Sequence, residues 1–171
     1  GIGLFRTEFL FLNRTDPPTE AEQTKAYTQA VKAMAPLPVV IRTADLGGDR
    51  LSQLGFDTAK DEANPFMGLR GIRLFLRYSD LFKVQMRAIL RASVHGKARV
   101  LLPMVSSMGE LRSARRIFAT ARQELAQEGV DVPADVELGI MVEIPSAAIV
   151  LDHLLAEADF ISIGTNDLIQ Y

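Results

Sequence analysis

The sequence predicts an α/β fold built on a parallel sheet, and two observations support this prediction. Short apolar runs that suit buried strands alternate along the chain with stretches that suit amphipathic helices. Most of these apolar runs are followed at once by charged or polar residues. A parallel sheet is covered on both faces, so its strands are continuous apolar runs, and ligand-binding groups collect at their carboxyl ends. The pattern therefore predicts both the fold and the edge of the sheet that carries a site.

Five apolar runs have the length and composition of buried strands. They cover residues 1–5, 39–41, 100–102, 138–142 and 160–164. The first run leads into Arg6, the second into Arg42 and Asp45, the third into Pro103 and Met104, the fourth into Glu143, and the fifth into Thr165, Asn166 and Asp167. Four of the five strands thus end on side chains that can bind anions or cations.

Capping motifs mark the starts of two helices between these strands. Residues 19–22 and 107–110 each place a hydroxyl three positions before a glutamate, which is the pattern of a capping box. We predict that the first helix runs to about Met34 and that the second ends at Gly129.

Serine, proline and glycine delimit the remaining segments. We predict helices over residues 65–76, over residues 80–95 with Gly96 as the C′ residue, and over residues 145–158. Residues 47–63 are polar and rich in turn formers, which predicts a long loop near the site.

The distribution of the polar strand ends favours a barrel over an open sheet. An open doubly wound sheet gathers its ligand-binding groups at one switch point, whereas a barrel mouth draws them from several strands. A complete (β/α)8 or TIM barrel has eight strands and typically about 250 residues. We therefore predict a partial TIM barrel with about five of the eight strands, and expect residues 1–171 to be a fragment of one barrel domain from a longer protein.

Composition excludes several classes of function. The net charge of −2 gives no reason to expect nucleic acid or an anionic membrane as a partner. Cysteine is absent, so neither a disulfide nor a thiolate metal site is possible, which suits a cytoplasmic protein. The apolar runs all fall short of the roughly 20 residues that span a bilayer, so we expect no membrane insertion.

Two carboxylates are candidates for a metal site. Glu143 and Asp167 each follow an apolar strand, and neither lies beside a histidine in the sequence. Mg²⁺ prefers one or two carboxylates together with substrate oxygens and water. The alternative is that Glu143 forms an ion pair with an arginine and that Asp167 caps a helix.

Three arginines are candidates for anion binding. Arg6, Arg42 and Arg70 carry guanidinium groups, which match phosphate and carboxylate in a bidentate manner. Beside metal-type carboxylates, these arginines indicate a phosphorylated, metal-bound substrate. The alternative is structural ion pairing, of Arg6 with Glu8 and of Arg42 with Asp45.

Six segments together resemble one known family. They are GLFRTEFLF (3–11), RTADLGGD (42–49), NPFMGLR (64–70), QMRAILRAS (85–93), MVEIP (141–145) and GTNDL (164–168). In this order and spacing, they resemble the phosphoenolpyruvate (PEP)-binding domain of enzyme I of the bacterial phosphotransferase system, within the wider family of PEP-utilising enzymes. The resemblance covers essentially the whole chain and implies the barrel fold.

The resemblance implies a substrate and the residues that bind it. Arg6 and Arg42 are expected to bind the phosphate of PEP, and Asn166 is expected to contact the same substrate. Asp45 and Arg70 are expected to line the same mouth as orienting or phosphate-proximal groups.

The resemblance also implies a cofactor and a reaction. Glu143 and Asp167 are expected to hold Mg²⁺, which bridges oxygens of PEP. The phosphoryl group then moves to a histidine on a separate N-terminal domain and onward to the phosphocarrier HPr, which feeds sugar uptake, while pyruvate is released. The family also dimerises through this domain, and the open edges of a partial sheet favour self-association.

The chain departs from the family in ways that limit its own activity. The phosphohistidine domain, the cysteine that protonates the enolate and the last barrel strands are absent, so we expect no catalytic residue in this chain and no complete reaction. One alternative parent is a pyruvate phosphate dikinase or a PEP synthase, which have similar Arg-Thr-Glu and Gly-Thr-Asn-Asp segments. The stretch RTADLGGD resembles enzyme I instead. The other alternative is a non-catalytic binding module on the same barrel.

Overall fold

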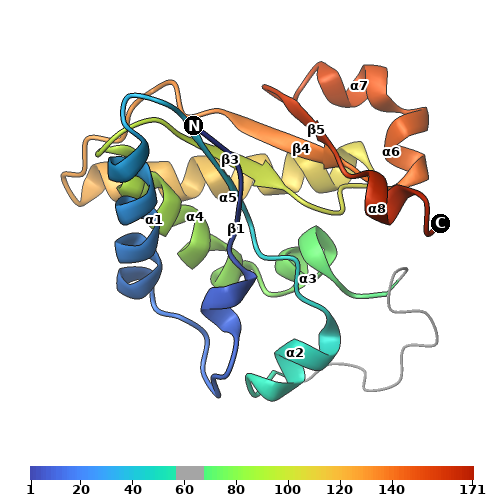
Figure 1. Cartoon of the computed structure of the whole chain (residues 1–171), viewed down its shortest axis with the longest axis horizontal. Helices are drawn as coiled ribbons and strands as arrows, with labels where there is room; N and C mark the ends of the chain where they lie inside the picture. Colours follow the sequence, from blue (N-terminus) through green and yellow to red (C-terminus); the bar gives the residue numbers. More distant parts are fainter. Residues whose placement is uncertain (57–67) are drawn as a thin grey trace.

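The computed structural model of the chain describes residues 1–56 and 68–171 (Figure 1). Its sheet consists of β1 (Ile2–Arg6), β2 (Val39–Arg42), β3 (Ala98–Leu102), β4 (Leu138–Val142) and β5 (Ile161–Ile163). All neighbouring strands are parallel, and their order in space is their order along the chain. A doubly wound sheet would reverse this order at a switch point. The predicted partial (β/α)8 barrel is therefore confirmed.

Helices follow the strands and cover one side of the sheet. They are the 3-10 helix η1 (Glu8–Phe11) and the α-helices α1 (Glu20–Met34), α2 (Gly48–Gln53), α3 (Gly71–Arg77), α4 (Ser79–Ser93), α5 (Met108–Gln127), α6 (Pro145–Ile149), α7 (Leu151–Leu155) and α8 (Thr165–Leu168). The longest of them, α1, α4 and α5, pack against one another, with α4 between the other two. This layer contacts β2 and β3, as the arrangement in Figure 1 shows.

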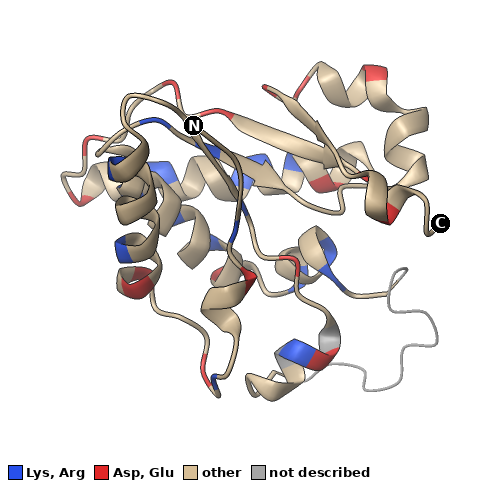
Figure 2. Cartoon of the chain, in the orientation of Figure 1, with Lys and Arg blue, Asp and Glu red and all other residues tan. Residues whose placement is uncertain are grey.

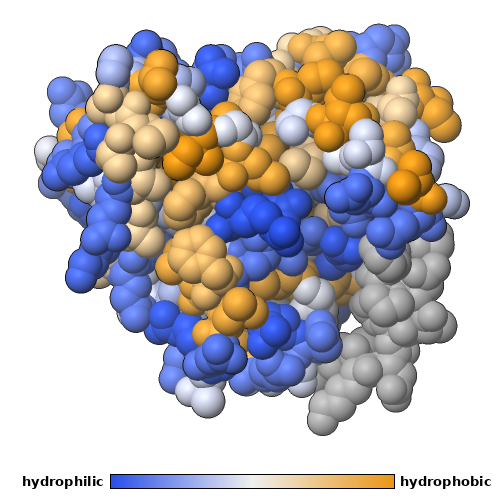
Figure 3. Space-filling view, in the orientation of Figure 1, coloured by the Kyte–Doolittle hydropathy of each residue, from blue (hydrophilic) through white to orange (hydrophobic). Residues whose placement is uncertain are grey.

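The hydrophobic core lies between this helical layer and the sheet. Ile41 and Val100 of the strands and Phe82 and Ile89 of α4 are completely buried. The inner strand β4 is buried along its whole length, whereas the edge strands β1 and β5 are partly exposed. The Ile163 side chain on β5 is largely exposed. The face of the molecule in Figure 3 carries hydrophobic patches that border a hydrophilic area. One side of the sheet is therefore sealed and the other is open.

The charged residues show no segregation by sign. Figure 2 shows acidic and basic positions interspersed on the same helices and strand ends. In the part of the chain that the structure describes, no helix combines the length and the apolar character needed to cross a membrane.

Both predicted capping boxes are present. The Thr19 hydroxyl accepts a hydrogen bond from the Glu22 backbone N–H at 3.2 Å, and the Glu22 carboxylate accepts one from the Thr19 N–H at 2.8 Å. Ser107 and Glu110 make the equivalent contacts at the start of α5. The predicted end of the first helix at Met34 is also confirmed. The second helix, α5, ends at Gln127 with Glu128 as its C-cap, so Gly129, with a φ of +79°, follows the helix as its C′ residue.

Three predicted elements differ from the structure. The predicted loop over 47–63 contains α2, because a polar segment can form an exposed helical turn without an apolar stripe. The predicted helix over 145–158 is two helices, since Val150 leaves helical geometry between α6 and α7 (φ −103°, ψ 23°). The predicted start of a helix at 64–65 lies outside the described residues, and α3 begins at Gly71.

The end of α4 also differs from the prediction, because the helix stops at Ser93 and Gly96 lies beyond the C′ position. Gly96 has a φ of +154°, and a Cβ atom there would lie 2.9 Å from Cγ1 of Val31. This glycine therefore allows the chain to pass close to α1.

We predict that Ser107→Ala lowers the free energy of unfolding by about 1 kcal/mol, because it leaves the first turn of α5 without its side-chain acceptor. Ser113 lies inside the same helix, where its exposed hydroxyl donates to the Gly109 carbonyl and accepts from Nη2 of Arg116, and it caps no helix end. Ser113→Ala is the matched control and should change stability by less than about 0.5 kcal/mol. Urea unfolding of both variants measures the difference, and equal losses would contradict the assignment of the cap.

Candidate functional site

One cavity at the carboxyl ends of the strands brings the predicted site residues together. Its volume is about 520 Å³, and β1, β2, β4 and the segment after β5 all contribute to it. The cavity is lined by all seven residues singled out from the sequence: Arg6, Arg42, Asp45, Arg70, Glu143, Asn166 and Asp167. Parallel strands place their carboxyl ends at the same edge of the sheet, which explains this convergence.

Strand register places the first two arginines side by side. Arg6 and Arg42 are direct partners across the β1–β2 ladder. The Arg6 side chain is 70% exposed and that of Arg42 only 8%, so one guanidinium faces solvent and the other is fixed in the wall. Neighbouring guanidinium groups repel each other unless an anion lies between them.

Glu8 supplies that anion within the protein. Its Oε1 accepts hydrogen bonds from Nη2 of Arg42 and from the backbone N–H of Asp45, both at 2.8 Å. Its Oε2 lies 3.7 Å from Nε of Arg6. Of the two alternative ion pairs, Arg6 with Glu8 is present, whereas Arg42 pairs with Glu8 in place of Asp45.

Asp45 holds the third arginine. Nε and Nη2 of Arg70 donate to its two carboxylate oxygens at 3.1 and 2.6 Å, in a bidentate arrangement. Nη2 of Arg70 also lies 3.6 Å from Oδ1 of Asp167. Burial alone would lower the pKa of Arg70, but the hydrogen bonds to Asp45 and the nearby carboxylates raise it. Arg70 therefore stays charged and ties two acidic residues of the cavity together.

Glu143 is a completely buried carboxylate at the end of β4. Its Oε1 accepts a hydrogen bond from the Met104 backbone N–H at 2.7 Å, and its Oε2 is buried with no hydrogen-bond partner among the described residues. Burial is the main cause that raises the pKa of Glu143 to about 7, and the charges of Asp45 and Asp167 act in the same direction, against the Met104 hydrogen bond and the charge of Arg42. A buried oxygen of this kind is costly unless a cation or donor reaches it.

A hard cation fits this arrangement. Asp167 lies in the first turn of α8, and its side chain is about one-fifth exposed. The N-cap of that helix is Gly164, so the alternative role of Asp167 as the capping residue is wrong. Within residues 1–56 and 68–171 no three acidic, histidine or cysteine side chains form a metal cluster. Mg²⁺ held by Glu143 and Asp167 would therefore take its other ligands from substrate oxygens and water.

Gly164 makes room for the Glu143 carboxylate. A Cβ atom at Gly164 would lie 2.7 Å from both Cβ and Oε2 of Glu143. The absence of a side chain at position 164 thus lets β5 approach β4 closely at the cavity.

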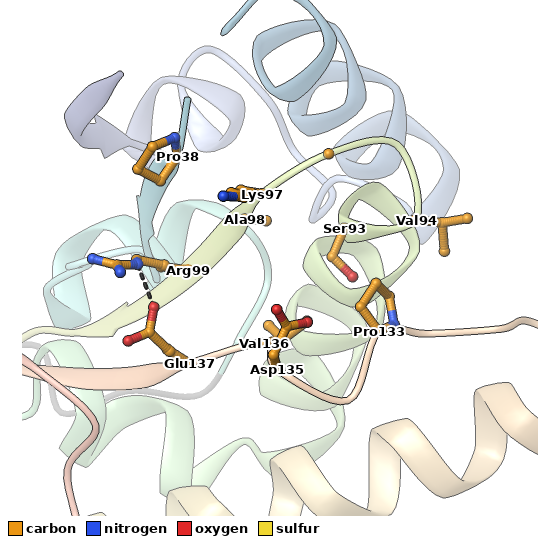
Figure 4. A pocket seen from close by; sticks show the side chains of 11 residues that line it. Pro38, Ser93, Val94, Lys97, Ala98, Arg99, Pro133, Asp135, Val136 and Glu137 are labelled. Carbon is orange, nitrogen blue, oxygen red and sulfur yellow. Dashed lines mark ion pairs between the residues drawn. The ribbon is translucent and has the colours of Figure 1, made fainter. Parts of the chain in front are cut away.

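A second cavity lies at the opposite end of the strands (Figure 4). Its volume is about 420 Å³, and it includes Lys97, Asp135 and the ion-paired side chains of Arg99 and Glu137. None of the predicted site residues lines it. In (β/α)8 barrels this amino-terminal end serves stability, whereas chemistry occurs at the carboxyl end.

Sequence reasoning missed two contributors to the carboxyl-end cavity. Glu8 was considered only as a partner of Arg6, although it contacts Arg42 and Asp45 more closely. The Met104 N–H was missed because a backbone donor leaves no trace in residue type. Met104 adopts a positive φ of 61°, which is an unusual conformation for a non-glycine residue. The structure shows this feature of the Met104 backbone, but the residue type does not predict it.

The fold and the cavity define a partial (β/α)8 barrel whose mouth combines guanidinium groups with carboxylates, as in proteins that bind phosphorylated substrates with a divalent cation. The chain belongs to the family described as PEP-utilising enzyme, PEP-binding domain, whose sequence profile matches residues 1–171. This match confirms the resemblance seen in the sequence.

Individual relatives agree with the family match. The chain is 49% identical to a phosphoenolpyruvate-protein phosphotransferase of Priestia megaterium and 50% identical to one of Staphylococcus aureus, each over 100% of this chain. It is 48% identical to one of Enterococcus faecalis over 99% of this chain. In each case the chain spans 30% of the length of the relative.

We predict that Gly164→Ala lowers the free energy of unfolding by about 1–3 kcal/mol, because the new methyl group overlaps the buried Glu143 side chain. Gly109→Ala is the matched control, since a Cβ atom there meets nothing closer than 3.9 Å and the residue lies in helix α5. Alanine suits a helix better than glycine, so the control should be neutral or stabilising. Denaturant unfolding measures the stability of both variants. If Gly164→Ala were as stable as the unmodified chain, β4 and β5 would not be packed as closely as the structure indicates.

Proposed function

We propose that this chain forms the PEP- and Mg²⁺-binding part of a phosphotransferase. The observation that carries the proposal is the single cavity lined by three arginines and three acidic residues at the carboxyl ends of the strands. The relatives are named phosphoenolpyruvate-protein phosphotransferase, and this name supports the same substrate.

The arginines are assigned to the phosphate. Arg42 is held in the wall by Glu8, so its guanidinium is oriented before a ligand arrives. Arg6 is exposed, and its ion pair with Glu8 is long at 3.7 Å, so its guanidinium can turn toward an anion. Guanidinium groups around the equatorial oxygens supply the positioning and charge that phosphoryl transfer requires. Asn166 and the Arg70–Asp45 pair complete the proposed contacts from the other side of the cavity.

The carboxylates are assigned to the metal. Glu143 and Asp167 are the proposed ligands, and the unpartnered Oε2 of Glu143 is the atom that supports this assignment. When bound, Mg²⁺ would offset charge on the phosphoryl group and on the departing enolate of pyruvate. When ionised, Glu8, Asp45, Glu143 and Asp167 outnumber the three arginines, so we expect PEP to bind only together with the cation.

In the whole protein, the proposed reaction breaks the P–O bond of PEP and forms a bond from phosphorus to a histidine on a separate N-terminal domain. The phosphoryl group then passes to HPr for sugar uptake, in the cytoplasm. No group of the present chain is assigned as nucleophile or proton donor, so the chain alone is proposed to bind PEP without turning it over.

We predict Mg²⁺-dependent binding of PEP to the chain, with binding lost in Glu143→Gln. This variant keeps an acceptor for the Met104 N–H but removes the negative charge that holds the cation. Calorimetric titration with PEP, with and without Mg²⁺, measures the effect. Asp152→Asn is the control, because its side chain is 78% exposed on α7, outside the cavity. PEP binding by Glu143→Gln equal to that of the unmodified chain would refute the metal assignment.

We also propose that the chain self-associates, as a dimer or through its sheet edges. β1 and β5 each pair with a single neighbouring strand in the described sheet, and they expose Leu4, Ile161 and Ile163. Unpaired edges and exposed apolar side chains favour association.

Sedimentation velocity at increasing protein concentration should show a shift from monomer to a larger species. Ile163→Lys places a charge on the exposed edge strand and should move this equilibrium toward the monomer, with little loss of stability. A purely monomeric chain at every concentration would contradict the proposal.

A further inference from the structure

A buried hydrogen-bond network lies directly behind the cavity, with the side-chain amide of Gln85 at its centre. Gln85 is in the middle of α4 and is completely inaccessible to solvent. Its Oε1 accepts a hydrogen bond from the Ala44 backbone N–H at 3.0 Å. Its Nε2 donates to the Thr7 hydroxyl at 3.2 Å and to the Tyr27 hydroxyl at 2.9 Å. One side chain thus connects the ends of two strands with two helices.

The network has a single consistent direction of donation. The Thr7 hydroxyl accepts from Gln85 and donates to the Arg42 carbonyl oxygen at 2.8 Å. The Tyr27 hydroxyl accepts from Gln85 and donates to Oε1 of Gln23 at 3.0 Å. Burial raises the pKa of Tyr27, so this hydroxyl keeps its proton. Because each hydroxyl has both a donor and an acceptor, the Gln85 amide can adopt only one orientation.

Two of the three groups bound by Gln85, those of Thr7 and Ala44, belong to the segments that carry the phosphate-binding candidates. Thr7 separates Arg6 from Glu8, and Ala44 lies between Arg42 and Asp45. The segment after β2 is held by successive N–H groups: that of Thr43 donates to Leu101, that of Ala44 to Gln85 and that of Asp45 to Glu8. The middle one of these three anchors is the only one that comes from helix α4.

We propose that Gln85 is a positioning residue for the phosphate site, which sets the spacing between the arginines at the ends of β1 and β2. The inference rests on the proposed function, because the spacing between the arginines matters only if they bind phosphate. The spacing itself can be tested without PEP. Without the Gln85 oxygen, the Ala44 N–H is a buried donor that has lost its partner, and such a group costs enough to displace its segment. Arg42 and Asp45 flank that segment, so they would move with it.

A purely structural role for Gln85 would give a different result. Any core substitution lowers the stability of the whole domain, but only loss of the network disturbs the strand ends locally. Leu125→Ala is therefore the control, because Leu125 is fully buried in α5, outside the network and the cavity. Gln85→Met is the test variant, since methionine has similar length and no amide group. Thr7→Val is a milder test variant that keeps the shape of the side chain and removes its hydroxyl.

The experiment uses the full 171-residue chain without ligand and then with PEP and Mg²⁺. Nuclear magnetic resonance follows the Arg42 Nε–H signal and the hydrogen exchange of the Ala44 and Asp45 amides. We expect Gln85→Met to shift the Arg42 signal and to speed exchange at Ala44 at least tenfold beyond the change in Leu125→Ala. Thr7→Val should shift the Arg42 signal in the same direction by a smaller amount. In the titration, Gln85→Met should weaken PEP binding at least tenfold.

The two measurements separate this inference from the proposed function. If the unmodified chain binds no PEP, the proposed function fails for the chain, while the ligand-free signals still decide the role of Gln85. If Gln85→Met changes those signals no more than Leu125→Ala does, Gln85 is only a core residue and the inference is overturned. If Gln85→Met does not fold, the Arg42 signal and the Ala44 exchange rate are compared between Thr7→Val and Leu125→Ala. Changes in Thr7→Val no larger than those in Leu125→Ala would then overturn the inference.

Discussion

Parallel pairing of each strand with the next one along the chain is the constraint on which the site depends. It aligns the carboxyl ends of all five strands at one edge and holds Arg6 opposite Arg42. A shift of one residue between β1 and β2 would turn one of these two side chains to the other face of the sheet. The buried strand β4 places Glu143 at the same edge, where Gly164 leaves room for its carboxylate. Strand register therefore determines which side chains meet at the site.

The charged groups around that edge are largely paired, but three buried atoms lack a hydrogen-bond partner among the described residues: Oε2 of Glu8, Nε of Arg42 and Oε2 of Glu143. Glu8 accepts a hydrogen bond from Nη2 of Arg42 and lies 3.7 Å from Nε of Arg6, and Asp45 accepts from both Nε and Nη2 of Arg70. Glu143 has only the Met104 N–H for one of its two oxygens, although it is the most deeply buried acid of the set. Keeping such a group costs folding free energy, so its presence at this point is better explained by a ligand than by stability. The polar network around Gln85 has the opposite character, since its hydroxyls have both a donor and an acceptor.

The fold was predictable where the signal was local. The positions of the strands followed from continuous apolar runs, although only the limits of β4 match the structure at both ends. The starts of α1 and α5 followed from capping boxes, which involve residues only three positions apart. The prediction was wrong at α2, at Val150 and at the end of α4, where packing between segments decides whether the chain turns. Gly96 is an example, because its position reflects the passage close to Val31 of another helix, which no neighbouring residue reveals.

The sequence by itself determined the family, the parallel partial barrel and seven of the residues that line the cavity, because the type of residue that follows a buried strand is visible in the order of the chain. Only the tertiary structure decided which of these residues contact one another. Glu8 bridges to Arg42 across 34 positions and Gln85 to Thr7 across 78, and such long-range hydrogen bonds depend on strand register and helix packing. The Met104 N–H and the burial of Glu143 are likewise properties of the assembled sheet, because the same groups in an extended chain would be hydrated by water.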